Sequence, residues 1–326
     1  MPPTDDQLRL SVILPTYRRP AALRRCLEGL AAGTRLPGET LVVAHRQDPE
    51  SGELEALLAP FCERLGARLV WAERAGQIHQ MNAGLAAATG EVVCFTDDDC
   101  VPRPPWLERL AAPYADASVG GVGGRDVVHH GDRISEAPGR RVGPITWCGR
   151  VIGNHHLCFP PGLIEVQHLK GANMSFRREI TPPLDPRMVL GAGSGSLNDT
   201  ELSLAVRARG YRLLYDPEAL VDHYPAPRHG ATHRNLDHPE QVFLDAHNWA
   251  YCLSKHSPWT RRLVFLLYAY GMGCGNRPGV VKYLGAVPRG PAAATRQWLV
   301  TCRGLRAGRR AWREAQAETR GAEGKD

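Results

Sequence analysis

The sequence predicts an α/β fold with a doubly wound, mostly parallel sheet flanked by helices and followed by a helical C-terminal extension. Short apolar stretches alternate with amphipathic helical patterns between residues 10 and 124, the spacing typical of repeated strand–helix–strand units. The apolar run 90–96 is stopped by three adjacent carboxylates, as expected for a buried parallel strand whose end opens into a site. With 326 residues, 43% of them hydrophobic, the chain can bury a sizeable core.

The first 124 residues hold the elements that repeat in this pattern. Helices are expected to follow each strand, and Pro20 suits the start of the first helix, because the first helical N–H has no partner within the helix. Strands are predicted at residues 9–14, 41–44, 67–72 and 90–96, and helices at residues 21–32, about 52–65, 77–88 and 104–114.

The pattern is weaker after residue 124. Residues 125–166 have no clear period and are predicted as strands joined by loops. The remaining predicted elements are a strand at 170–177, a Gly/Ser-rich loop at 185–197, a helix at 202–209 ended by Gly210, strands at 212–215 and 219–223 on either side of a turn at Asp216-Pro217, and helices at about 238–256, 259–272 and from 292 onward. We therefore expect a domain over residues 1–234, with halves at about 10–124 and 125–234, and a helical extension over 235–326.

The cysteines and the N-terminal residues predict a cytoplasmic protein. Residues 1–9 are polar and lack the apolar segment of a signal peptide. The nine cysteines are scattered and never spaced C-x-x-C, which favours reduced thiols over a disulfide framework or a zinc site.

Positive charge is concentrated in residues 255–313, which contain twelve Lys or Arg and no Asp or Glu. The segment therefore carries +12, although the whole chain carries +6. Within it, residues 263–276 are uncharged but shorter than the roughly 20 residues that span a bilayer. This combination predicts a helix lying on an anionic membrane, with nucleic acid and a solvated helical tail as alternatives.

Three neighbouring carboxylates, Asp97-Asp98-Asp99, follow the strand at 90–96. Their charges repel one another, and hard oxygen ligands suit Mg²⁺ or Mn²⁺, so a divalent cation is expected there. Asp97 and Asp99 share a face if the segment is extended, whereas Asp98 points elsewhere. The alternative is a solvated acidic turn.

The order of several short motifs resembles the family 2 glycosyltransferases over about residues 10–224. The motifs are Pro15-Thr16-Tyr17-Arg18, Arg74-Ala75-Gly76, Asn82-Ala83-Gly84, Asp97-Asp98-Asp99, Gly171-Ala172-Asn173-Met174, Asn198-Asp199-Thr200-Glu201-Leu202 with Arg207 and Gly210-Tyr211, and Val221-Asp222-His223. The resemblance implies a GT-A fold, a nucleotide-diphosphate sugar donor, a DXD-type metal motif and inversion at the anomeric carbon.

The resemblance also implies which residues bind the nucleotide sugar. These are Pro15, Thr16, Tyr17, Arg18, Arg74, Gln77, Asn82, Asp97 and Asp98. Core packing of Tyr17, a surface position for Arg74, and helix capping or packing by Gln77 and Asn82 are the alternatives. The family often has an acidic residue directly after the second strand; here Asp48 lies a few residues later and is the expected substitute.

Asp199 is the expected general base, because an inverting transfer requires a carboxylate that takes the proton from the attacking hydroxyl. The same stretch fits a capping box formed by Asn198 and Glu201, and both interpretations can hold together. The family commonly has Glu-Asp where this chain has Asn198-Asp199.

By the same resemblance, Asp99 and His223 are the expected metal ligands, with an ordinary loop histidine as the alternative for His223. Imidazole suits Mn²⁺ better than Mg²⁺. Asn173 and Trp147 are expected to contact the acceptor, with core or loop packing as the alternative for Trp147.

The predicted function is metal-assisted, inverting transfer of a sugar to a hydroxyl of a cell-envelope glycan, a lipid-linked acceptor or a small molecule. The first half of the domain would bind the nucleotide sugar and the second half the acceptor. The predicted location is the cytoplasm, peripheral to the inner face of the plasma membrane, with no nucleic-acid partner. A non-catalytic nucleotide- or sugar-binding protein and a nucleotidyltransferase are the alternatives.

Overall fold

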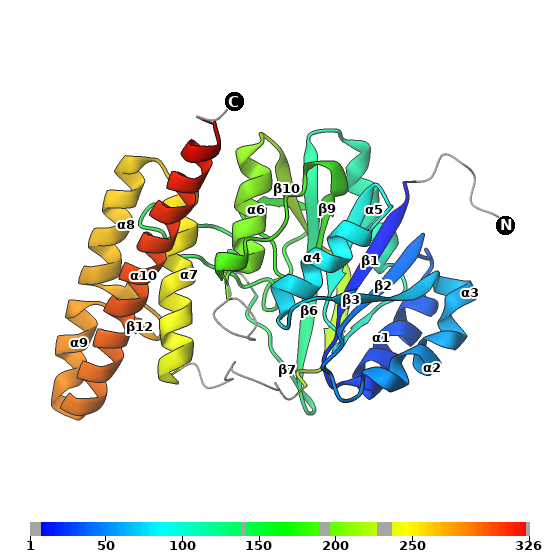
Figure 1. Ribbon diagram of the computed structural model, residues 1–326, viewed down its shortest axis with the longest axis horizontal. Coiled ribbons are helices and arrows are strands. Elements are labelled where there is room, and N and C mark those ends of the chain that lie inside the picture. The colour runs from blue at the N-terminus through cyan, green and yellow to red at the C-terminus, as the bar shows by residue number, and fades with distance from the viewer. Residues whose placement is uncertain (1–7, 139–140, 189–195, 227–236, 324–326) are drawn as a thin grey trace. The chain divides into compact units, whose positions relative to one another are not determined.

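The computed structural model describes residues 8–138, 141–188, 196–226 and 237–323 (Figure 1). The chain forms two compact units. The first comprises Met1–Pro144, Ile152–Leu184 and Leu202–His229, and the second comprises Ile145–Val151, Asp185–Glu201 and Gly230–Asp326. The domain boundary predicted at residues 234–235, most of the loop predicted at 185–197 and most of the polar N-terminus lie outside the described residues.

Four parallel strands make one side of the sheet in the first unit. In spatial order they are β3 (Ala67–Ala72), β2 (Glu39–His45), β1 (Leu10–Pro15) and β4 (Val92–Thr96). Ile13 lies between Leu41 and Phe95 in the register. The carboxyl ends of these strands therefore lie at the same edge of the sheet, as the sequence predicts.

The other side of the sheet is mixed, because one antiparallel strand lies between β4 and the next parallel pair. The strands there are β9 (Asn173–Arg177), β6 (Val119–His130), β10 (Arg212–His223) and β5 (Cys100–Pro102), with β7 (Arg133–Ile134) on β6 and β8 (Ile164–Val166) on β10. The described strands thus form a sheet of the predicted α/β class.

Residues 125–166 contain the end of β6 together with β7 and β8, in agreement with the predicted strands joined by loops. One prediction for this side is wrong in detail. The turn predicted at Asp216-Pro217 is a bulge within the single strand β10, where the register against β6 shifts between Asp216 and Leu220. Proline has no N–H to pair, and a bulge is one of the few places in a sheet that tolerates it.

Helices pack on both faces of the parallel strands. Alternate residues of β1, such as Val12 and Leu14, face a core shared with the helix that follows β1, whereas Ile13 faces α4. A Cβ on Gly84 of α4 would lie 2.4 Å from a methyl carbon of Ile13, so only glycine permits this approach. The helices of this unit are α1 (Pro20–Ala31), α2 (Leu54–Leu58), α3 (Cys62–Leu65), α4 (Gln77–Ala87), α5 (Trp106–Ala111) and most of α6 (Asn198–Ala208).

The helix predicted at about 52–65 is divided into α2 and α3. The tight turn between them, Ala59–Phe61, contains Pro60. Proline removes a helical hydrogen bond and clashes with the preceding turn, which explains the break.

The second unit contains the four C-terminal helices. They are α7 (Pro239–His256), α8 (Trp259–Gly271), α9 (Val280–Ala286) and α10 (Pro291–Glu323), with a small hairpin of β11 (Gly273–Cys274) and β12 (Arg277–Pro278) between α8 and α9. The sequence did not predict α9. A Cβ on Gly308 of α10 would lie 2.1 Å from the carbonyl oxygen of His247, so this glycine lets α10 touch the α7 backbone.

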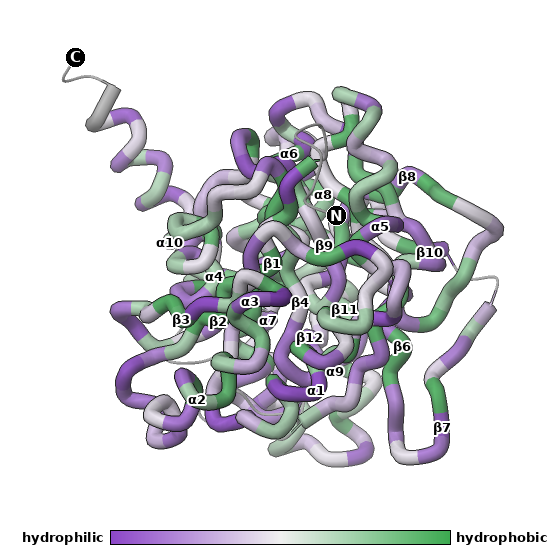
Figure 2. The backbone as a smooth tube through the Cα atoms, turned by 90° about the vertical axis from the view of Figure 1, so that its right-hand side faces the viewer, coloured by the Kyte–Doolittle hydropathy of each residue, from purple (hydrophilic) through white to green (hydrophobic). Residues whose placement is uncertain are grey.

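None of the described helices is both long enough and apolar enough to cross a bilayer. The last turns of α10 are strongly hydrophilic, as the purple segments in Figure 2 show.

Glu39, the first residue of β2, joins the N-terminal ends of three neighbouring strands. Its carboxylate accepts hydrogen bonds from Ser11 Oγ (2.7 Å), Thr89 N (2.6 Å), Thr89 Oγ1 (2.8 Å) and Arg68 Nη2 (3.0 Å). Burial alone would raise the pKa of Glu39, but the hydrogen bonds, led by that from Ser11, lower it to about 2. The charged form is therefore the one that stabilises the fold.

We expect Glu39→Gln to lower the free energy of unfolding by about 2 kcal/mol at neutral pH, because the amide leaves buried donors unmatched. The ordinary pKa of 4.5 lies above the folded value. The stabilisation by Glu39 is therefore complete above about pH 4.5 and is lost as the pH falls towards 2. Urea unfolding of both proteins across this range measures the effect. The exposed Glu63→Gln is the control, and an unfolding difference for Glu39→Gln that is unchanged near pH 2 would contradict the assignment.

Candidate active site

The three adjacent carboxylates lie in the turn after β4, beside the loop that leaves β1. Thr16 Oγ1 donates to Asp98 Oδ2 (2.8 Å). Arg19 Nη1 donates to Asp98 Oδ1 (2.9 Å) and lies 3.4 Å from Asp99 Oδ2. The loop after β1 therefore supplies a hydroxyl and a cation to the acidic turn. Thr16 is among the residues predicted from the sequence, whereas Arg19 is not, because its only signal is its position in the same loop.

The environment gives the three carboxyl groups different proton affinities. Burial raises the pKa of Asp98 to about 7, against the opposing charge of Arg19. Removal from water and the neighbouring charge of Asp99 also raise the pKa of Asp97. Burial acts the same way on Asp99, but His223 and the N–H of Ala226 outweigh it, so the pKa of Asp99 is lowered. Asp99 is thus the member of the turn that is held as an anion.

His223, the last residue of β10, lies between two carboxylates. Its Nε2 is 3.4 Å from Asp99 Oδ1, and its Nδ1 is 3.4 Å from Asp126 Oδ2. Burial would lower the pKa of His223, but these two acids raise it to about 9. Asp126 also accepts a hydrogen bond from Lys170, whereas its buried Oδ1 has no hydrogen-bond partner among the described residues. His223 is among the residues predicted from the sequence, whereas Asp126 and Lys170 are not.

The donor atoms at this point fit a divalent cation. A carboxylate oxygen of Asp99, the Cys100 thiol and a ring nitrogen of His223 lie within 4.8 Å of one another. Burial raises the pKa of the Cys100 thiol well above its usual range, so it stays protonated and is a poor ligand. Because Asp126 contacts Nδ1 of His223, the Nε2 atom of the same ring is directed at Asp99. A carboxylate that contacts the second nitrogen of a histidine is the arrangement that orients metal ligands. Asp99 and His223 are therefore the pair that could hold Mg²⁺ or Mn²⁺, and because the pKa of His223 is raised to about 9, the cation would displace the proton from Nε2 on binding.

The loop after β1 is held in an unusual conformation. Arg18 has φ of 56°, in the left-handed region, and its N–H donates to Asp48 Oδ2 (2.8 Å). The other oxygen of Asp48 accepts from the N–H of Glu50 (3.0 Å). Asp48 is buried and binds backbone groups, so these contacts support a role in shaping the loop. Its predicted contact with the base stays a prediction.

The remaining predicted nucleotide residues lie around the same edge with different environments. The Arg18 guanidinium lies 5.3 Å from the centroid of the Tyr17 ring. Gln77, the first residue of α4, reaches Asp97 Oδ1 (3.3 Å), and Arg74 is exposed. Asn82 instead exchanges hydrogen bonds with the backbone N–H and carbonyl of Leu184 (2.7 and 2.8 Å), which supports the packing alternative.

Gln80 was not predicted from the sequence as a residue of this region. Its side-chain amide donates to the carbonyl oxygens of Thr16 (2.7 Å) and Val43 (2.9 Å). It thereby joins the ends of β1 and β2 beneath the loop that carries Arg18.

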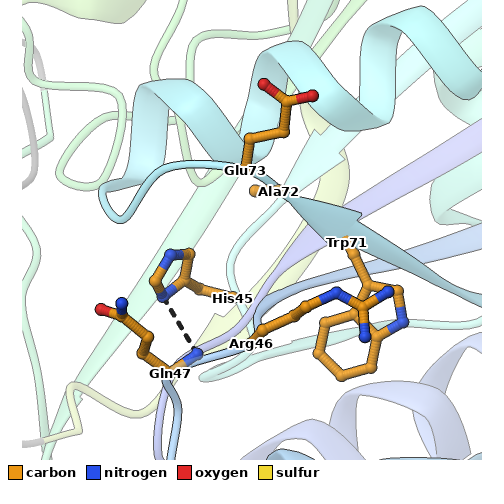
Figure 3. Close-up of a pocket in the computed structure, with 6 residues that line it drawn as sticks. All are labelled: His45, Arg46, Gln47, Trp71, Ala72 and Glu73. Atoms are coloured by element: carbon orange, nitrogen blue, oxygen red, sulfur yellow. Dashed lines mark hydrogen bonds between the residues drawn. The ribbon is translucent and has the colours of Figure 1, made fainter.

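A pocket of about 530 Å³ opens at the carboxyl ends of β2 and β3 (Figure 3). The Arg46 guanidinium lies over the Trp71 ring, 4.8 Å from its centroid. The lining residues are His45, Arg46, Gln47, Trp71, Ala72 and Glu73. The pocket offers an aromatic and a cationic plane together with polar groups, a combination suited to a nucleobase. Trp71 was not singled out from the sequence.

Asp199, the predicted base, lies in the first turn of α6, in the part assigned to the second unit. Its Oδ1 accepts from the N–H (2.7 Å) and hydroxyl (3.3 Å) of Thr200. Two residues on, the buried Glu201 accepts from Lys255 Nζ (2.7 Å) and His256 Nε2 (3.0 Å) at the end of α7. Glu201 therefore anchors this turn to α7, a role that the predicted capping box did not include.

The two predicted acceptor residues differ in exposure. Asn173 is buried, accepts from Trp106 Nε1 (2.8 Å) and donates to the carbonyls of Arg125 (3.1 Å) and Ala219 (2.8 Å). Its amide is engaged inside the sheet, which supports a structural role. Trp147 belongs to the second unit and is largely exposed, with the Arg261 guanidinium 5.9 Å from its ring centroid. Acceptor contact by either residue stays a prediction.

Residues 11–182, more than half of the chain, match the sequence model of glycosyl transferase family 2. The chain belongs to this family. Among curated relatives, the glycosyltransferase AglE of Haloferax volcanii is 28% identical over 35% of this chain and 38% of its own length. The uncharacterized glycosyltransferase alr2836 of Nostoc is 26% identical over 55% of each chain. The O-antigen biosynthesis protein RfbC of Myxococcus xanthus is 26% identical over 68% of this chain and 18% of its own length.

Solved structures show the same fold for this glycosyltransferase. GalNAc-T7 with UDP, GalNAc and Mn²⁺ superimposes with a TM-score of 0.62 at 17% identity, over 90% of this chain and 54% of that one. The mannosyltransferase PcManGT of Pyrobaculum calidifontis, in complex with GDP-Man and Mn²⁺, gives 0.54 at 18% identity, over 93% and 86%. The predicted GT-A fold and the predicted family are confirmed. The chain spans 38% and 55% of the lengths of AglE and alr2836.

Proposed function

We propose that this glycosyltransferase moves a sugar from a nucleotide-diphosphate donor to a hydroxyl acceptor, with inversion and with the help of a divalent cation. The observation that carries the proposal is the acidic turn after β4, in which Asp99 is kept as an anion opposite His223. The Mn²⁺ bound by GalNAc-T7 and PcManGT supports the same requirement here.

We assign the predicted residues separate roles in this reaction. Asp99 and His223 would hold the cation, which when bound supplies Lewis-acid stabilisation of the departing diphosphate. Asp97 and Asp98 face the ribose and the sugar. Asp199 takes the proton from the acceptor hydroxyl. At the same time the hydroxyl oxygen forms a bond to C1 of the sugar, and the bond from C1 to the phosphate oxygen breaks. The products are the glycoside and a nucleoside diphosphate.

The pocket beside Trp71 is the proposed base site. It lies at the carboxyl end of β3, on the same edge of the sheet as the acidic turn. Ligands of open α/β sheets bind at this edge. The exposed Arg74, close after the strand, is the proposed diphosphate contact, because a guanidinium can donate two hydrogen bonds to phosphate oxygens.

The proposed acceptor belongs to cell-envelope glycan or polysaccharide synthesis, either lipid-linked or a small molecule. The relative named as an O-antigen biosynthesis protein supports this class. The proposed location is the cytoplasm, peripheral to the inner face of the plasma membrane.

A panel of UDP- and GDP-sugars, each with and without Mn²⁺, tests the proposal. We expect one donor to raise the melting temperature only when Mn²⁺ is present, because a ligand that binds the native state stabilises it.

We further expect Trp71→Ala to weaken nucleotide binding roughly tenfold through lost stacking. The exposed Leu36→Ala serves as the control.

Product analysis separates the proposal from its alternatives. Release of a nucleoside diphosphate from the stabilising donor supports transfer, whereas release of pyrophosphate from a nucleoside triphosphate would identify a nucleotidyltransferase. Donor binding without any product, across a range of acceptors, would identify a non-catalytic binding protein.

A further inference from the structure

Large apolar side chains are exposed along α8 and α9 in the second unit. On α8, Trp259, Leu263 and Leu267 are 72%, 53% and 68% exposed. Their spacing of four residues puts them on one side of the helix. On α9, Val281 and Leu284 are 55% and 60% exposed. We call these five residues the apolar face.

The opposite side of α8 is already used for packing. Phe265 and Ala269 are fully buried, and the Phe265 ring meets Trp249 of α7 edge-to-face, with centroids 4.9 Å apart. The hydrophobic inner side therefore accounts for the stability of α8 within the unit. The apolar face lies outside this core and is more than half exposed at every one of its five residues, and exposed apolar residues of this kind typically mark an interaction surface.

The second unit also carries exposed cations on α9 and α10. Lys282 lies between Val281 and Leu284 on α9, and its side chain is exposed. Arg296, Arg303 and Arg306 of α10 are exposed as well. No ion pair among the described residues includes any of the four. Residues 255–313 contain no acid, so a partner with negative charge would complement this segment.

We infer that the apolar face lies on an anionic lipid bilayer, with α8 and α9 in the plane of the headgroups. Tryptophan and leucine on one side of a helix, with lysine and arginine nearby, is the composition of interfacial helices. Basic residues near the surface add attraction to anionic lipids, which falls with ionic strength. This inference is independent of the proposed reaction, because the apolar face and the cations bind lipid whether or not sugar is transferred.

Vesicle flotation with the full chain tests the inference. The expected result is binding to vesicles of phosphatidylcholine with 30% phosphatidylglycerol, at least tenfold weaker binding to phosphatidylcholine alone, and loss of binding as salt rises from about 0.1 to 0.5 M. Leu263→Ser combined with Leu267→Ser and Leu284→Ser is expected to reduce binding more than tenfold. Lys282→Gln combined with Arg296→Gln is expected to reduce it several-fold, only on anionic vesicles.

The matched control replaces two exposed apolar residues of the first unit, Leu36→Ser and Ile134→Ser, and should float like the wild type. Circular dichroism melting checks that each variant is folded, and transfer to a soluble acceptor reports on the reaction separately. Wild-type protein that stays unbound, or a triple variant that floats equally well, would overturn the inference. So would a wild-type dimer in sedimentation that the triple variant abolishes without a change in flotation, because the apolar face would then join two copies.

Discussion

Asp199→Asn is expected to reduce the rate of sugar transfer by roughly 10³-fold, because asparagine cannot take the proton from the acceptor hydroxyl. The substitution is expected to preserve the hydrogen bonds that Asp199 accepts from Thr200. Asp199 Oδ1 accepts from the N–H and hydroxyl of Thr200, and the amide oxygen of asparagine can accept the same bonds. The first turn of α6 should therefore keep its conformation. Steady-state kinetics with the identified donor measures the loss, which we expect in kcat.

Nucleotide binding and stability are the companion measurements for Asp199→Asn. Both should stay at wild-type levels, since the proposed donor contacts lie on other residues. Asp132→Asn, an exposed position in the turn between β6 and β7, is the matched control and should leave the rate unchanged. A variant that keeps a third or more of the wild-type rate would show that another group accepts the proton.

The position of Asp199 depends on contacts two residues away. Burial would raise the pKa of Glu201, but the hydrogen bond from His256 and the charge of Lys255 lower it, so the anion is the stable form. Glu201 thus ties the turn that carries the proposed base to the C-terminal end of α7. The sequence pattern Asn198-x-x-Glu201 suggested only a local cap, because nothing local indicates a partner 54 residues downstream.

Contacts between residues that are far apart in the chain also explain why the sequence predicted only part of the fold and of the candidate site. Periodicity predicted the parallel strands, and the acidic run after Thr96 predicted the site, because both signals lie in consecutive residues. Asp126 was missed because it meets His223 only through the pairing of β6 with β10, across 97 residues. Trp71 and Arg46 share a pocket for a similar reason, since they lie at the ends of neighbouring strands.

Asp99→Asn is expected to weaken Mn²⁺ binding more than about 100-fold and to reduce the rate of sugar transfer correspondingly. Asp126→Asn should weaken Mn²⁺ binding by about 10- to 100-fold, which is the range found for groups that orient a metal ligand. The difference follows from geometry. Asp99 would present a carboxylate oxygen to the proposed cation, whereas Asp126 would act through its contact with His223 Nδ1. Asparagine at 99 can still accept from the N–H of Ala226, so the loop should persist.

Electron paramagnetic resonance titration of free Mn²⁺ measures these affinities without any turnover, so it separates metal binding from catalysis. Cys100→Ala is the matched control: if the protonated thiol is no ligand, its Mn²⁺ affinity should equal that of the wild type. Equal affinity in Asp99→Asn and wild type would place the cation elsewhere. A loss in Cys100→Ala as large as in Asp99→Asn would instead make the thiol a ligand, and the donor set of Asp99 and His223 would have to be enlarged.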